Sequence, residues 1–341
     1  MGSGKSVTSN LCLEHLLKYN THLTIFDIGG SYRSLCRRYD GVYLHFNLDN
    51  PQFKMNPFRR IPNTPSNVRS HCTLLRLLFR NNGYQPTLDD HRNIYDAVND
   101  IYTRPEDQRR LGHLKLRPEL RRAIANWVGK GEDAWLFDNE DDTVSFADMQ
   151  VIDFQGAEEE DLLNIMEPLL FYLLRLHAAI VQDVAKLALF KILWADEAWK
   201  FLGNETCRRK FMAAAKTYRK HNAGIALVTQ NVADLQNAGL LEIANEVCPT
   251  KMFLHNPGAD VAEYQRIFHW NEAEVEIFRS LAPKRDVFVK RGDQPGEKLQ
   301  IHLEPEALMR YGNSPFENIA KEKAMAAHGF EKGLSMAAGG R

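Results

Sequence analysis

Short apolar runs alternate with longer segments of helical spacing along most of the chain. The runs lie at 23–26, 43–46, 144–146, 151–154, 187–195, 224–229, 251–254, 286–290 and 299–303, and such runs are typical of strands covered on both faces. Between them, apolar positions recur with the helical period at 7–19, 34–38, 161–183, 205–221, 238–246, 259–268 and 271–280. This alternation predicts an α/β fold with a doubly wound, mainly parallel sheet.

One segment interrupts the alternation. Residues 59–142 have no convincing strand pattern and carry apolar residues with helical spacing at 68–79, 88–102 and 116–128. Asp89 and Asp90 stand at the start of the second of these helices, where carboxylates suit a helix N-terminus. The pattern predicts an all-helical insertion at 59–142, which divides the core into residues 1–58 and 143–305 and is followed by a helical or disordered tail at 306–341.

The composition is that of an ordinary soluble protein, with 44% hydrophobic and 26% charged residues and a net charge of −1. The overall charge therefore gives no argument for binding nucleic acid or an anionic membrane. The most apolar stretch, 162–181, contains Glu167, Pro168, Arg175 and His177, so we expect a buried helix there and at most a peripheral attachment to a membrane.

The five cysteines are odd in number and form no C-x-x-C pair. The first ten residues are rich in glycine and serine and contain no apolar core. These two features predict a protein without a disulfide framework, a zinc ribbon or a signal peptide, in the reducing cytosol.

The first residues match the end of a phosphate-binding loop. Gly4, Lys5 and Ser6 fit the last positions of the pattern G-x-x-x-x-G-K-[ST], whose glycines let backbone amides approach phosphate oxygens. We expect the loop to bind ATP, with Lys5 on the β- and γ-phosphates and Ser6 on Mg²⁺. The residues expected to contact the nucleotide are Gly2, Ser3, Gly4, Lys5, Ser6 and Val7.

The first glycine of that pattern would fall at position −1. The sequence therefore starts inside the motif, and we expect the strand that feeds the loop to be missing. Taken alone, such a short motif also fits a flexible tail, so its interpretation depends on a second motif elsewhere in the chain.

A pair of adjacent carboxylates supplies that second motif. Asp196 and Glu197 follow the apolar run at 187–195, and the carboxyl ends of strands are where open α/β sheets form their ligand crevice. This arrangement predicts that Asp196 holds Mg²⁺, directly or through water, and that Glu197 polarises the attacking water. A charged turn after a strand is the alternative interpretation, and the lysine loop favours the catalytic one.

Three further residues are candidates for the same site. Gln230 follows the next apolar run, where it can sense the γ-phosphate or serve as an ordinary turn residue. Among the basic residues of 205–221, we favour Arg219 as a cation donated to a neighbouring subunit, because it lies beside the run that ends at Thr229. Asp27 ends the 23–26 run and either faces the site or fixes a turn.

Together these motifs resemble the C-terminal motor domain of conjugal-transfer ATPases of type IV secretion systems, the TrbE/CagE/VirB-type family. The resemblance spans roughly 1–305, and its Cys-Pro-Thr-Lys element points toward the TrbE-like branch. The matching segments are G-S-G-K-S (2–6), F-D-I-G-G-S-Y (26–32), M-N-P-F (55–58), W-A-D-E-A-W (194–199), Y-R-K-H-N (218–222), V-T-Q-N-V-A-D-L (228–235), C-P-T-K-M-F-L-H-N-P (248–257) and P-K-R-D (283–286).

The resemblance implies a RecA-like P-loop NTPase core with an inserted helical subdomain. It implies hydrolysis of ATP with Mg²⁺ at the cytoplasmic face of the inner membrane, by a homo-oligomer, often a hexamer, that works with other secretion components in pilus biogenesis and substrate transfer. The positions that match the family's nucleotide site are Lys5, Ser6, Asp196, Glu197 and Gln230, and Arg219 matches the arginine of its Arg-Lys-x-Asn element.

Two other functions stay open at the level of sequence. A DNA-translocating motor of the FtsK/HerA or coupling-protein type would share the core, and the locally basic stretch 104–122 fits either a DNA-binding surface or a solvated helix face. The other alternative is a noncatalytic assembly module, because a sequence that starts inside the phosphate loop leaves that loop without its feeding strand.

Overall fold

The computed structural model describes residues 4–46, 52, 54–59, 61–144, 147–156, 163–197, 205–312 and 315–339. Its larger sheet is parallel and has the strand order β2-β3-β1-β4-β5. These strands are β1 (His22–Asp27), β2 (Val42–His45), β3 (Met149–Asp153), β4 (Lys191–Asp196) and β5 (Ala223–Val228). In this register Asp27 lies opposite Asp153, and Phe26 lies opposite Ala195, so three acidic strand ends meet at one edge.

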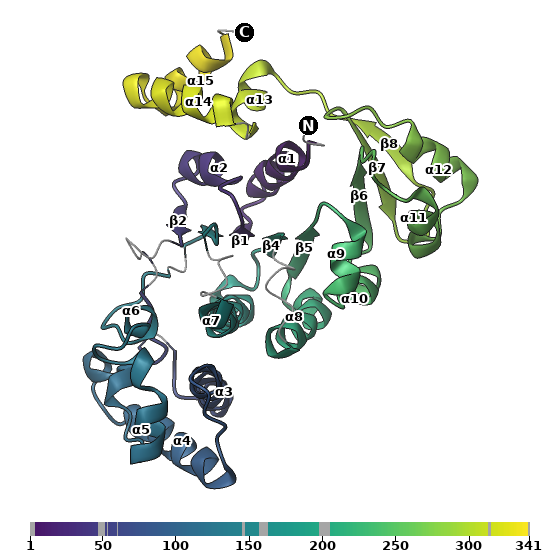
Figure 1. Ribbon diagram of the computed structural model, residues 1–341. Coiled ribbons are helices and arrows are strands. Elements are labelled where there is room, and N and C mark those ends of the chain that lie inside the picture. The colour runs from purple at the N-terminus through teal and green to yellow at the C-terminus, as the bar shows by residue number, and fades with distance from the viewer. Residues whose placement is uncertain are drawn as a thin grey trace.

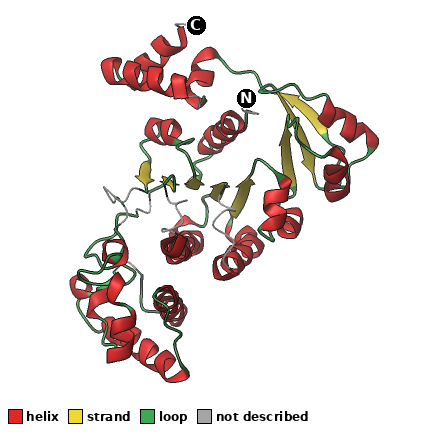
Figure 2. Ribbon diagram, viewed as in Figure 1, coloured by secondary structure: helices red, strands yellow, loops and turns green. Residues whose placement is uncertain are grey.

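Helices cover both faces of this sheet. Helices α1 (Lys5–Leu17) and α2 (Arg33–Arg38) lie on one face, and α7 (Leu163–Gln182) and α8 (Glu205–Thr217) lie on the other (Figures 1 and 2). Along β4, Trp194 packs in the hydrophobic cluster of α1 and α2, while Leu193 and Ala195 pack in the cluster of α7 and α8. Burial on both faces explains the continuous apolar runs, and the predicted mainly parallel sheet is confirmed.

Every regular element described between β2 and β3 is a helix or a 3-10 turn. This segment contains α3 (Pro65–Asn81), α4 (Leu88–Ile101), α5 (Pro118–Ala123) and α6 (Ala134–Phe137), with short 3-10 turns between them. Figure 1 shows this group beside the sheet, with α3 next to α7. The helix expected at 116–128 begins at Pro118 and ends at Ala123, because Ile124 leaves the helical conformation with φ −101° and ψ 2°, and a 3-10 turn follows at Ala125–Trp127.

The last three strands form a separate antiparallel sheet with the order β6-β7-β8, instead of continuing the parallel one. They are β6 (Thr250–Leu254), β7 (Asp286–Arg291) and β8 (Glu297–Gln300). Phe253 and Phe288 of this sheet pack with Trp270, between α11 (Val261–Phe268) and α12 (Glu272–Arg279). The strand expected at 299–303 is observed at Glu297–Gln300, as an exposed edge strand.

Some other element bounds also differ from the prediction. The strand expected at 187–195 begins at Lys191, after a 3-10 turn. One helix was expected at 238–246, but Gly239, with a φ of 67°, separates α9 (Val232–Asn237) from α10 (Leu241–Val247). The end of the run at 144–146 lies outside the described residues.

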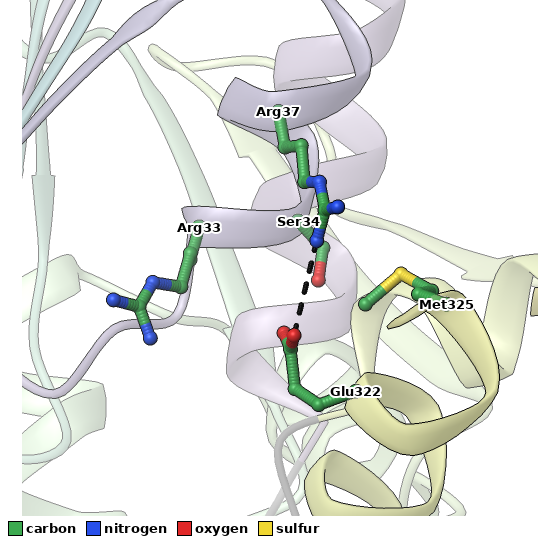
Figure 3. Close-up of a pocket in the computed structure, with 5 residues that line it drawn as sticks. All are labelled: Arg33, Ser34, Arg37, Glu322 and Met325. Carbon is green, nitrogen blue, oxygen red and sulfur yellow. Dashed lines mark ion pairs between the residues drawn. The ribbon is translucent and has the colours of Figure 1, made fainter. Parts of the chain in front are cut away.

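The C-terminal helices return to the first helices of the chain. They are α13 (Pro305–Tyr311), α14 (Pro315–His328) and α15 (Phe330–Gly339), and Figure 1 shows them beside α2. Glu14 of α1 accepts a hydrogen bond from the Tyr311 hydroxyl and forms an ion pair of 3.5 Å with Arg310. Figure 3 shows Arg37 of α2 facing Glu322 of α14, where the two form an ion pair of 3.8 Å.

The apolar helix expected at 161–183 is α7. Its segment Asn164–Gln182 is the one described segment that is long and apolar enough to cross a membrane, and 72% of it is buried inside the fold. The helix packs against α3 and α8, so its apolar surface belongs to the protein core, as the sequence predicted.

Candidate nucleotide site

The phosphate loop runs directly into the first helix. Gly4 is the N-cap of α1 and has a left-handed φ of 94°, which glycine adopts without steric cost. A Cβ atom on Gly4 would lie 3.1 Å from Cα of Lys284, a tight contact that also disfavours a side chain there. Lys5, Ser6 and Val7 form the first turn, where the positive end of the helix dipole favours an anion. Gly2 and Ser3 lie outside the described residues.

Lys5 joins the loop to the carboxylate pair. Its Nζ atom lies 2.8 Å from Oδ1 of Asp196 and 2.6 Å from Oε1 of Glu197, although these residues are 191 and 192 positions away in the sequence. Burial alone would lower the pKa of Lys5, but the two carboxylates outweigh it and raise that pKa above its usual value. The fold thus brings the two predicted motifs into direct contact.

Glu197 sits on a strained turn at the end of β4. Its φ is 56°, a left-handed value that is uncommon for a residue with a side chain. The backbone N–H of Glu197 donates to the carbonyl oxygen of Val228, 3.0 Å away at the end of β5, and only 7% of the residue is exposed. The turn and this hydrogen bond fix the glutamate beside Lys5, and strain of this kind gathers at functional sites.

The second oxygen of Asp196 is held by an aromatic pair. The Tyr32 hydroxyl donates to Oδ2 of Asp196 at 2.7 Å, and the indole nitrogen of Trp194 donates to that hydroxyl at 2.9 Å. Burial, together with the charges of Asp196 and Asp27, raises the pKa of Tyr32 well above its usual value, so the phenol keeps its proton. Sequence reasoning missed both aromatic residues, although they stand in the quoted motifs at 26–32 and 194–199.

Ser6 is tied to the loop that follows β1. Its hydroxyl lies 3.4 Å from the hydroxyl of Ser31, and the side chain of Asn10 donates to the carbonyl oxygens of Ser6 and Ser31 at 2.8 and 3.1 Å. Asn10 is buried on α1 and therefore fixes the start of that helix against the residues that lead to Tyr32.

Asp27 and Asp153 form a buried acidic pair next to Asp196. Asp27 is fully buried and accepts a 3.4 Å hydrogen bond from the backbone N–H of Tyr32 through Oδ2. Burial, then the charges of Asp153 and Asp196, raise the pKa of Asp27 to about 8. Asp153 accepts hydrogen bonds from the backbone N–H of Gly29 at 3.2 Å and from the Tyr43 hydroxyl at 2.6 Å. Asp27 therefore packs as a neutral acid under the site at neutral pH.

Gln230 and Arg219 lie at opposite edges of the sheet. Gln230 is exposed just after β5, at the same carboxyl edge as Asp196, and its backbone carbonyl accepts from the Asn256 side chain at 3.5 Å. Arg219 is exposed in the 3-10 turn Tyr218–His221 that precedes β5, at the amino edge. The fold thus places Gln230 on the edge that carries Lys5 and does not bring Arg219 to that edge.

Residues 1–112 match the family described as the TraG P-loop domain. The chain is 26% identical over 299 residues to the type IV secretion system protein virB4 of Bartonella quintana (strain Toulouse), with 85% of this chain and 37% of that protein covered. It is 27% identical over 347 residues to the conjugal transfer protein TrbE of Rhizobium radiobacter, with 96% of this chain and 40% of that protein covered.

One solved structure, that of VirB4 of Thermoanaerobacter pseudethanolicus, matches with a TM-score of 0.66 and 18% identity. The match covers 93% of this chain and 88% of that one, so the fold extends over nearly the whole chain. The chain spans about two fifths of the length of the two curated relatives.

Proposed function

We propose that the chain is an ATPase of the VirB4/TrbE type, which hydrolyses ATP and thereby energises conjugative secretion, as its similarity to type IV secretion proteins supports. The observation that carries this proposal is the position of Lys5, whose ammonium group lies within 2.8 Å of both Asp196 and Glu197. A phosphate-loop lysine, a metal-binding aspartate and a water-activating glutamate must share one small volume for phosphoryl transfer to water.

The residues of the site fit a Mg²⁺ ion. Magnesium in nucleotide sites takes one or two protein oxygens and completes its shell with phosphate oxygens and water, so a single carboxylate and one hydroxyl suffice. Asp196 and Ser6 are those ligands in the proposal, and bound Mg²⁺ would neutralise charge on the phosphates. Within the described residues, no group of three or more His, Cys, Asp or Glu side chains forms a separate metal site.

Each remaining residue has a distinct task in the proposed reaction. Lys5 moves from the carboxylates to the β- and γ-phosphates, and the amides at the start of α1 bind the same anion. Glu197, released from Lys5, orients the attacking water and accepts its proton. Gln230 contacts the γ-phosphate from the end of β5 and reports whether it is present.

The role proposed for Arg219 requires an oligomer. Because Arg219 is exposed at the amino edge of the sheet, it cannot serve the site of its own chain and is free to reach a neighbour. We therefore include in the proposal a homo-oligomer, possibly a hexamer, in which Arg219 completes the next subunit's site. In this proposal the ring works with other secretion components at the cytoplasmic face of the inner membrane, in pilus biogenesis and in transfer of DNA or protein.

Hydrolysis of Mg²⁺-ATP by the chain tests the proposal. Lys5→Ala should lose nucleotide binding, whereas Glu197→Gln should bind nucleotide like the parent and turn over about 10²-fold or more slowly, because it keeps its shape and loses the base. Turnover of the parent that equals both variants would exclude hydrolysis and favour the noncatalytic assembly module.

A further inference from the structure

A buried tyrosine lies behind the carboxylate pair and has no part in the reaction proposed above. Tyr32 is fully buried at the N-cap of α2, and its hydroxyl lies 2.7 Å from Oδ2 of Asp196 and 2.9 Å from Nε1 of Trp194. Its backbone N–H donates to Asp27, and its ring packs in the cluster of α1 and α2. Because the backbone and the ring of Tyr32 are both held, the position of its hydroxyl is fixed.

The direction of each hydrogen bond at this hydroxyl follows from the chemistry of its partners. An indole nitrogen can only donate, so the Tyr32 oxygen accepts from Trp194. An ionised carboxylate can only accept, so the Tyr32 proton points to Asp196. Trp194 thus orients the hydroxyl, and the hydroxyl in turn occupies one oxygen of the aspartate.

This arrangement restricts how Asp196 can present itself. The terminal torsion of an aspartate is broad, so an unrestrained carboxylate would turn freely at the end of β4. With Oδ2 bonded to Tyr32, the plane of the carboxylate is set and Oδ1 is the oxygen that faces Lys5 and the phosphate loop. Outer partners of this kind tune metal affinity by orienting the ligand.

We propose that Tyr32 is a positioning residue that orients Asp196 for the Mg²⁺ of a bound magnesium nucleotide, with Trp194 orienting Tyr32 in turn. The inference rests on the proposed nucleotide site and adds a residue to it. It concerns metal affinity, so its test does not depend on turnover.

The chain offers a matched control for the loss of a hydroxyl. Tyr43 of β2 donates at 2.6 Å to Oδ2 of Asp153, another buried carboxylate at a neighbouring strand end. Tyr32 belongs to the hydrophobic cluster against which the half-buried Tyr43 packs, so replacing either by phenylalanine removes one phenol donor from one buried acid. Only Tyr32 is bonded to the aspartate of the site.

The measurement is binding of a fluorescent ATP analogue, N-methylanthraniloyl-ATP, first in EDTA and then across a Mg²⁺ series. Tyr32→Phe should raise the Mg²⁺ concentration for half-saturation about tenfold and leave binding in EDTA within about twofold of the parent. Tyr43→Phe should stay within about twofold in both conditions. Trp194→Phe removes the donor that orients the hydroxyl, so it should shift the Mg²⁺ dependence in the same direction by a smaller factor, even if Tyr32→Phe does not fold.

Three results would overturn the proposal: a parental Mg²⁺ dependence in both the Tyr32 and Trp194 variants, an equal loss of binding with and without Mg²⁺, or an equal shift in Tyr43→Phe. Hydrolysis measured in parallel separates this inference from the proposed function. A parent that binds the magnesium nucleotide without turning it over refutes the activity and still decides the role of Tyr32, whereas a parent that binds no nucleotide refutes both.

Discussion

The buried carboxyl of Asp27 should make the protein less stable as the pH rises, and replacing Asp27 with asparagine should abolish this part of the pH dependence. Asp27 is fully buried, and its pKa is raised to about 8 by burial and by the charges of Asp153 and Asp196. The folded state therefore keeps a proton that the unfolded chain releases near its ordinary pKa of 3.8. Stability from this group is complete below pH 3.8 and is lost as the pH rises toward and through 8.

The magnitude follows from proton linkage. A single proton held only by the folded state changes the free energy of unfolding by about 1.4 kcal/mol per pH unit, and integration from pH 6.5 to 8.0 with a folded pKa of about 8 gives about 1.6 kcal/mol. The asparagine side chain would keep the oxygen that accepts from the Tyr32 backbone and would carry no titrating proton. The gain in stability of Asp27→Asn over the parent should thus be about 1.6 kcal/mol larger at pH 8.0 than at pH 6.5.

Urea unfolding of both proteins at the two pH values measures this difference. Burial lowers the pKa of His22 to about 4, and that of His71 and His177 to about 3, and these histidines change stability in the opposite direction. They do so equally in both proteins, so they cancel in the comparison. Asp293→Asn, at an exposed turn, controls for a lost surface charge. A difference between parent and Asp27→Asn that is the same at both pH values would refute the reasoning.

Two other substitutions test the loop and the oligomer. Gly4→Ala should lower the free energy of unfolding by about 1–2 kcal/mol in a urea titration, because its φ of 94° and its contact with Lys284 exclude a Cβ atom. Parental stability of that variant would contradict the loop geometry. Arg219→Ala should bind nucleotide like the parent but lose hydrolysis where subunits meet, and mixing it with Lys5→Ala should restore part of the activity. No recovery in mixed oligomers would argue against the trans role.

The parallel core could be predicted because its central strands β1, β3 and β4 are buried along their whole length, which leaves continuous apolar runs in the sequence. The same runs gave no sign that β6, β7 and β8 form their own antiparallel sheet. Strand pairing is a contact between distant segments, and a local period carries no information about the partner. One helix boundary moved where Gly239, with its left-handed φ, separates α9 from α10.

The chemistry of the site was predictable where residue type and spacing carry it. Lys5, Asp196 and Glu197 were predicted from short motifs, and the fold brings the three together. Tyr32 was not predicted, because its role depends on a hydroxyl that meets Asp196 across a separation of 164 positions. Position in three dimensions, and not residue type, distinguishes it from the other tyrosines of the chain.

The central place of β1 in the sheet constrains the order in which the chain can fold during synthesis. Strand β1 pairs with β3 and β4, so the ribosome must release residues up to Asp196 before the first strand has both neighbours. The contacts of Glu14 form still later, because its partners Arg310 and Tyr311 lie in α13, one of the last helices to be synthesised. Helices α3 and α4 pack on each other, and α3 also packs on α7, which ends at Gln182 before β4 is made, so this group needs less of the chain. We therefore expect this inserted helical unit to gain structure on the ribosome first, while the earlier-made phosphate loop is completed last.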